Sequence, residues 1–356
     1  MNQIKRIVQN GYKCDGYNPD LELAFISLKI ALIAYASTYK EFQHDFPLIL
    51  LDKETDYTKI SKNKKYQILY TETIIHFQHF FELTLKHFLR NSHPLLSDKI
   101  PYDNSLLLYK ILNRQELSHD ESMRLESIEF GETIKRIKTL RNQISDIEIL
   151  NLMESDLTAL SELNSLRNRI WHRGIFILNY DALDEFICGF IFPILKKILN
   201  IELFKSAETE WKYQRLACSL DPLNELFELS SSQKIDIGKL SMLKELCRSA
   251  YNNPLTMDNI DNEYIHDCEN HLQREKYVEL ANIIVSATSG FVTECPVCKT
   301  GSLVNYIDYE GGIDTEKNIE YYTDRVSCTC CDFSLVRGFK NASEYNFNGI
   351  PDFNLS

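Results

Sequence analysis

Residues 71–90 read TETIIHFQHFFELTLKHFLR, and their apolar side chains recur every three or four positions. The positions that fall on one face of a helix are Ile74, Phe77, Phe81, Leu85 and Phe88. This spacing is typical of an amphipathic α-helix. Pro94 follows, and a helix seldom continues through proline because proline lacks the backbone N–H. The stretch therefore predicts one long helix with a largely aromatic buried face.

Helical periodicity extends over most of the chain on both sides of this stretch. Further helices are expected at 21–35, 133–144, 157–171, from 181 onward, 240–250 and 271–285. Gly174 is suited to end one of them, and Pro193 predicts a kink in another. Strand-like sequence appears only late, at 303–309 and 321–326, with Gly311 and Gly312 suited to a turn between them. The fold class expected is mainly α, with a small β unit at the C-terminus.

Ten cysteines occur in the chain, and five of them lie within residues 295–331. They form the clusters Cys295-Pro-Val-Cys298 and Cys328-Thr-Cys330-Cys331. Two C-x-x-C pairs can turn four thiolates toward one tetrahedral Zn²⁺, which leaves no open position for catalysis. The predicted ligands of a structural zinc are Cys295, Cys298, Cys328 and Cys331, although Cys330 could replace either member of the second pair. Because the predicted strands lie between the pairs, the unit resembles a zinc ribbon, a small sheet stabilised by its metal.

Composition favours an ordinary globular protein of more than one domain, with 356 residues, 44% of them hydrophobic and 25% charged. The net charge of −12 is unevenly distributed. Residues 1–205 carry 26 Lys and Arg against 27 Asp and Glu, whereas residues 206–356 carry 13 against 24. The near-neutral N-terminal part can present a local basic face, so the net charge does not exclude an RNA substrate.

The stretch 166–174 reads LRNRIWHRG, in which Arg167 is followed directly by Asn168 and five positions later by His172. This pattern resembles the R-x4-6-H motif of the HEPN superfamily, a group of α-helical proteins many of which are metal-independent ribonucleases. Upstream, Glu82 and Lys86 resemble the Glu and Lys four apart that recur in the first long HEPN helix. The resemblance covers about residues 65–205 and implies a HEPN-like helical bundle.

The resemblance also implies an endoribonuclease that cleaves RNA through attack by the 2′-hydroxyl and leaves a 2′,3′-cyclic phosphate. His172 would be the general acid or base, because histidine titrates near working pH. Arg167 would hold the charge that builds on the phosphate, and Asn168 would orient it. No metal would take part in catalysis. Basic residues that could bind the substrate are Arg169, Arg173, Lys138 and Arg141.

Partners follow from the same resemblance. Five residues of a regular helix separate two side chains by about 140° and about 7.5 Å, so Arg167 and His172 do not share one narrow stripe. HEPN proteins typically dimerise with two motifs facing one cleft, which implies a homodimer with two histidines at one site. Such nucleases commonly serve in phage defence or toxin–antitoxin pairs, so an antitoxin or trigger protein is a further expected partner.

Other interpretations of the same residues remain open. Arg167 could be a surface cation, Trp171 a core anchor and His172 a residue near a helix end. The basic run over residues 135–141 could be a solvated face rather than an RNA track. The HEPN helices and the ribbon could also form a non-catalytic interaction or regulatory protein.

These patterns predict four segments along the chain. They are an N-terminal helical segment (1–60), a HEPN-like helical domain (61–205), a helical connecting region (206–288) and the zinc ribbon (289–356). The first twenty residues lack the apolar core of a secretion signal, and Lys29 interrupts the apolar stretch that follows. The scattered remaining cysteines fit reduced thiols. A cytoplasmic protein without a membrane partner is therefore expected.

Overall fold

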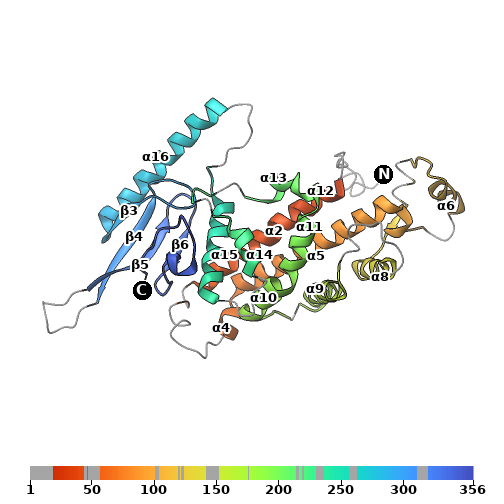
Figure 1. Cartoon of the computed structure of the whole chain (residues 1–356), viewed down its shortest axis with the longest axis horizontal. Coiled ribbons are helices and arrows are strands. Elements are labelled where there is room, and N and C mark those ends of the chain that lie inside the picture. The colour runs from red at the N-terminus through yellow and green to blue at the C-terminus, as the bar shows by residue number, and fades with distance from the viewer. Residues whose placement is uncertain are drawn as a thin grey trace, which may run out of the picture. The chain divides into compact units, whose positions relative to one another are not determined.

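The structure is a computed structural model, and most of its described residues are helical (Figure 1). A small antiparallel sheet lies near the C-terminus, so the coarse fold class is confirmed. The described residues are 19–43, 46, 57–100, 104–118, 121, 124–141, 152–174, 176–213, 216–218, 220–229, 236–255, 263–310 and 320–355. The turn predicted at Gly311 and Gly312 lies outside them, as does the start of the N-terminal segment.

Two compact units make up the chain. The first consists of Met1–Lys29 and Ile75–Arg167, and the second of Ile30–Ile74 and Asn168–Ser356. Three long helices contribute residues to both units: α2 (Pro19–Phe42), α5 (Lys64–Ser92) and α9 (Glu154–Arg173). The four segments expected from the sequence stay a prediction.

The first unit is built on α5, whose aromatic residues form its core. Its remaining elements are η1 (Pro94–Leu96), β1 (Asp98–Lys99), α6 (Ser105–Leu112), β2 (Glu126–Ser127) and α8 (Phe130–Leu140). Phe77, Phe81 and Leu85 are fully buried, as the periodicity predicts, and so are Phe80 and Leu89 outside the predicted face. Buried positions around most of its circumference make α5 a central helix rather than a surface one.

The second unit contains the remaining helices and the sheet. Its helical elements are α4 (Tyr57–Ser61), α10 (Tyr180–Phe186), the π-helical η3 (Ile187–Ile191), α11 (Phe192–Leu199), α12 (Glu202–Lys205), α13 (Glu208–Trp211), α14 (Pro222–Leu229), α15 (Ile237–Asn252), α16 (Glu263–Ala287) and the 3-10 turn η5 (Ala342–Tyr345). The π-helical turn directly precedes Pro193, where a kink is expected. Proline cannot supply the usual hydrogen bond to the preceding turn, so an irregular helix at this point has a direct chemical cause.

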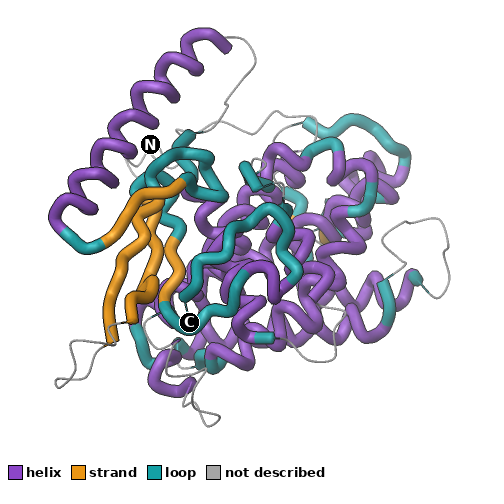
Figure 2. The backbone as a smooth tube through the Cα atoms, turned by 60° about the vertical axis from the view of Figure 1, so that its left-hand side comes forward, coloured by secondary structure: helices purple, strands orange, loops and turns teal. Residues whose placement is uncertain are grey.

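The C-terminal sheet has four antiparallel strands in the order β3-β4-β5-β6. Its central strands β4 (Leu303–Glu310) and β5 (Glu320–Cys328) confirm the predicted strands. The edge strands β3 (Gly290–Thr293) and β6 (Ser334–Val336) have only four and three residues, too few for a clear alternation. Helix α16 contacts β3 and β4, while α15 contacts β6 (Figures 1 and 2).

Among the described residues, α2 is the one helix that is both long and apolar enough to be compared with a membrane span. Over Leu21–Phe42 its mean hydropathy is 1.5, so by length and composition it could cross a membrane, but 61% of that window is buried inside the fold. Within the second unit, Tyr35 packs edge-on against Phe192 at 5.4 Å, and Phe42 stacks on Tyr180 at 4.4 Å. These contacts are those of a core helix, and the cytoplasmic location stays a prediction.

Helix α9 ends at the predicted glycine. Gly174 has a φ of +61°, and its N–H donates to the carbonyl oxygens of Arg169 at 3.1 Å and Ile170 at 3.0 Å.

The substitution Gly174→Ala tests this helix end. Since no heavy atom lies within 4 Å of where the Cβ would be, the substitution should act through the backbone alone. We expect a loss of about 1 kcal/mol in the free energy of unfolding, measured by chemical denaturation. The control is Gly189→Ala, since Gly189 has the same open space around its Cβ position but lies within a helix. Alanine is favoured over glycine there, so stability should be unchanged or higher, and equal losses in the two variants would contradict this explanation.

Candidate functional site

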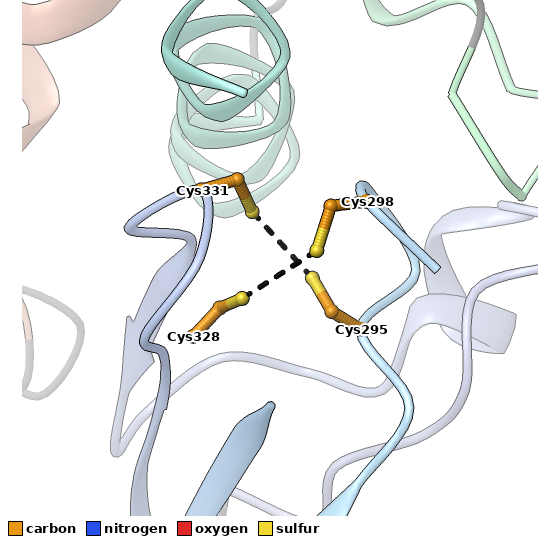
Figure 3. A group of neighbouring side chains, drawn as sticks. All are labelled: Cys295, Cys298, Cys328 and Cys331. Atoms are coloured by element: carbon orange, nitrogen blue, oxygen red, sulfur yellow. Dashed lines mark hydrogen bonds between the residues drawn. The ribbon is translucent and has the colours of Figure 1, made fainter. Parts of the chain in front are cut away.

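The four predicted cysteine ligands converge on one point. Cys295 and Cys298 follow β3, Cys328 ends β5, and Cys331 precedes β6. All four side chains are buried, and their sulfur atoms lie within 4.8 Å of one another (Figure 3). The Sγ atoms of Cys295 and Cys331 are 3.6 Å apart, and those of Cys298 and Cys328 are 3.7 Å apart.

These distances fit one tetrahedral metal ion. A disulfide would need about 2.05 Å between sulfurs, so the separations exclude bonds between these cysteines. Four Zn–S bonds of about 2.3 Å imply sulfur separations of about 3.8 Å across a tetrahedron. Burial raises the pKa of the Cys295 thiol well above its usual value, so this sulfur needs a cation beside it to be a thiolate. The residues present therefore could bind a metal through all four sulfurs.

Similar backbone turns hold the two cysteine pairs. Lys299 follows the first pair with a φ of 55°, and its N–H donates to the carbonyl of Cys295 at 3.0 Å. Asp332 follows the second pair with a φ of 59°. A left-handed residue directly after the second cysteine reverses the chain, so both sulfurs of each pair point to the same side.

Cys330 is not a member of the four-cysteine group. Its backbone N–H lies 3.4 Å from Sγ of Cys328 and donates to it. Hydrogen bonds of this kind stabilise negative charge on a ligating sulfur. The geometry therefore gives Cys330 a supporting position and makes Cys331 the fourth member of the group that could bind a metal.

A buried ion-pair network supports the second cysteine pair, and sequence reasoning missed it. On α15, Arg248 contacts Glu245 through Nε–Oε2 at 2.7 Å, and its Nη1 donates to Oδ2 of Asp332 at 2.9 Å. Glu245 also accepts a 2.6 Å hydrogen bond from the N–H of Ser334, at the start of β6. Arg248 precedes Asp332 by 84 positions, so no local pattern could have indicated this contact.

The three predicted catalytic residues lie in the C-terminal half of α9. Arg167 and Asn168 are partly buried, and His172 is exposed in the last turn of the helix. Trp171 is 65% exposed, so the interpretation of Trp171 as a core anchor is wrong. The indole remains solvent-exposed beside His172 in the sequence, one turn before the helix ends at Gly174.

Within the first unit, α5 carries a cluster of titratable groups. Burial lowers the pKa of His79, Glu82 opposes this shift, and the positive charges of His76, Lys86 and Arg167 add to it. Lys86 and Glu82 form the expected pair four residues apart, with Nζ and Oε1 at 2.5 Å. His79 is half-buried, and its Nδ1 lies 2.8 Å from the hydroxyl of Ser27.

The four proposed substrate-binding residues differ in their surroundings. The guanidinium of Arg169 lies over the ring of Phe176 at 4.8 Å, a cation–π contact that leaves its donors outward. Lys138 and Arg141 both pair with Glu154, which neutralises part of the basic run. The side chain of Arg173 lies outside the described residues.

The fold and site define a mainly helical protein with a buried four-cysteine centre beside a small antiparallel sheet. The chain matches no known protein family, no curated protein and no solved structure. Its function must therefore be inferred from the residues of the cysteine centre and of the α9 motif.

Proposed function

We propose that this chain is a HEPN-type endoribonuclease with a structural zinc ribbon. The observation that carries the proposal is the position of His172, which is exposed in the last turn of a long helix and follows Arg167 by five residues. The Glu82–Lys86 pair on α5 supports the HEPN resemblance.

In this proposal His172 exchanges a proton with the 2′-hydroxyl or with the leaving 5′-oxygen. An exposed imidazole can reach a substrate in solution, and an imidazole ring can both accept and donate a proton. Arg167 donates to the phosphate oxygens as negative charge develops, and Asn168 orients the phosphate. A second copy supplies the second histidine, so that one imidazole accepts a proton while the other donates one. This mechanism makes the homodimer part of the nuclease.

We further propose Zn²⁺ as the ion bound by the four cysteines, because an all-thiolate tetrahedral site is typical of structural zinc. The ion holds the ends of β3 and β5 together and takes no part in RNA cleavage. The resemblance also favours a cytoplasmic role in phage defence or as a toxin held by an antitoxin or trigger. The acidic part of the chain, residues 206–356, is a surface that such a partner could recognise by charge.

The test is incubation of the purified protein with total RNA and transfer RNA in EDTA, followed by analysis of the cleaved ends. Cleavage that leaves 2′,3′-cyclic phosphates is expected. His172→Ala should lower the rate about 100-fold or more, because it removes a general acid–base group. His271→Ala is the matched control, since His271 is also exposed on a helix, α16.

Cleavage that persists unchanged in His172→Ala would contradict the assignment of this residue. Cleavage that requires added Mg²⁺ would contradict the metal-independent mechanism. Binding of RNA or of a protein partner without any cleavage would favour the non-catalytic alternative.

A further inference from the structure

Helix α16 packs on the sheet with only one of its faces. Ala281 is fully buried, and the carbonyl of Tyr277 accepts a 2.8 Å hydrogen bond from Oγ1 of Thr329. Val278 lies beside Gly301, with 3.9 Å between its Cγ2 and the position of a Cβ on that glycine. These residues define the inner face of the described side chains of α16, which cover residues 271–287.

The opposite face of α16 is also apolar, although solvent reaches it. Leu272 precedes Ala281 by nine residues, which is about 180° around a helix. Leu272, Leu280 and Ile283 are 61%, 45% and 56% exposed. A helix with apolar residues on two opposite faces is normally covered on both. The outer face therefore has the composition of a contact surface.

Four residues of this outer face follow the spacing of a coiled-coil seam. Leu272, Lys276, Glu279 and Ile283 are separated by four, three and four positions, which is the alternation of helices that pack side by side. The two middle residues, Lys276 and Glu279, carry opposite charges, and the two end residues, Leu272 and Ile283, are apolar. We call these four residues the α16 seam.

We propose that the α16 seam pairs with the seam of a second copy of this chain in an antiparallel orientation. In that register Leu272 faces Ile283 of the second copy, and Lys276 faces Glu279 of the second copy. The two-fold symmetry repeats both pairs, so the contact has two opposite-charge pairs at its centre and an apolar layer at each end. A two-fold contact must be self-complementary in this way.

Charge favours this occupant and this orientation. A parallel in-register pair would place Lys276 against Lys276 and Glu279 against Glu279, which is repulsive. Residues 206–356 are strongly acidic, but residues 271–287 carry two basic and two acidic side chains and no net charge. Two copies can therefore approach along α16 without the repulsion expected between the acidic surfaces around it.

Sedimentation velocity of the full-length protein, over a range of concentrations, tests the proposal. The wild type should form a dimer. Lys276→Glu should weaken dimerisation about 100-fold, because each central pair then joins like charges. The double variant Lys276→Glu with Glu279→Lys should restore the dimer, since both pairs are opposite in charge again. Lys64→Glu makes the same charge change at an exposed position of another helix and should leave the dimer unchanged.

A monomeric wild type, a dimer that persists in Lys276→Glu, or a double variant that stays monomeric would each overturn the proposal. Circular dichroism of every variant verifies that the helices are retained. The proposal depends on α16 alone and not on RNA cleavage, which is measured separately. Cleavage lost in His172→Ala with the dimer intact would leave the α16 contact standing, and a monomeric variant that still cleaves RNA would contradict the two-histidine site of the proposed nuclease.

Discussion

Cys295→Ser is expected to abolish the proposed zinc binding and to unfold the C-terminal sheet. The fully buried Cys295 contributes one of the four sulfurs of the centre. Structural zinc sites of this kind contribute on the order of 10 kcal/mol or more to folding, and the edge strands of this sheet have only four and three residues. Metal content by mass spectrometry should fall from one zinc per chain to none, and limited proteolysis should remove the region from residue 290 onward.

Cys330→Ser is the matched control for this experiment. Cys330 lies between Cys328 and Cys331 in the sequence but is not a member of the four-cysteine group. Its contribution is a backbone N–H, which serine retains. Zinc content should therefore stay at one per chain. Loss of zinc in Cys330→Ser with retention in Cys331→Ser would instead make Cys330 the fourth ligand.

Unfolding of the sheet should also destabilise α15 locally. Arg248 and Glu245 are buried and contact Asp332 and Ser334, which closely follow Cys331 in the chain. Hydrogen exchange of the α15 amides should therefore rise in Cys295→Ser and stay unchanged in Cys330→Ser. Protection of α15 that is equal in the two variants would show that the helix is stable without the ribbon.

The parts of the fold that the sequence predicts are those encoded by short-range patterns. Periodicity every three or four residues identifies α5 and α9, and the two C-x-x-C pairs identify all four members of the cysteine group. Gly174 ends α9 because a local backbone conformation requires it. In each case the determining residues lie within a few positions of one another, or form two pairs with the same C-x-x-C spacing.

The missed features depend on residues that are far apart in the chain. Lys244 pairs with Asp184 across 60 positions, and Arg248 with Asp332 across 84. A helical pattern indicates which face is buried but not which partner covers it. Trp171 is the clearest example of a burial that the sequence pattern predicts wrongly. An aromatic residue on this helix suggests a core anchor, whereas the side chain of Trp171 is 65% exposed.

Asp184→Ala is expected to be the most destabilising single substitution in the helical part of the second unit. The ammonium of Lys244 on α15 is fully buried and donates to Oδ1 of Asp184 at 2.8 Å and to the hydroxyl of Tyr180 at 3.0 Å. It also lies over the ring of Tyr35, at 4.5 Å from the ring centre. The pair therefore joins residues of α2, α10 and α15 within one polar cluster.

Asp184 and Lys244 each stabilise the charge of the other, which offsets the cost of burying both charges. Burial raises the pKa of Asp184 and lowers the pKa of Lys244, while each charge opposes the shift of the other. Removing the carboxylate leaves an ammonium without its counter-charge in an apolar interior. Breaking a buried pair in this way costs about 3 to 5 kcal/mol. The free energy of unfolding, measured from the slowest-exchanging amides of α10 and α15, should fall by that amount.

Asp181→Ala is the matched control, because Asp181 is an exposed carboxylate in the first turn of the same helix. Its removal should cost less than about 1 kcal/mol, through the helix dipole alone. The double variant Asp184→Leu with Lys244→Met removes both charges, and replacing a buried pair by apolar residues of similar size is often neutral. Most of the stability lost in Asp184→Ala should therefore return. A double variant that is less stable than Asp184→Ala would mean that the tyrosine contacts of Lys244, rather than its pairing with Asp184, hold these three helices together.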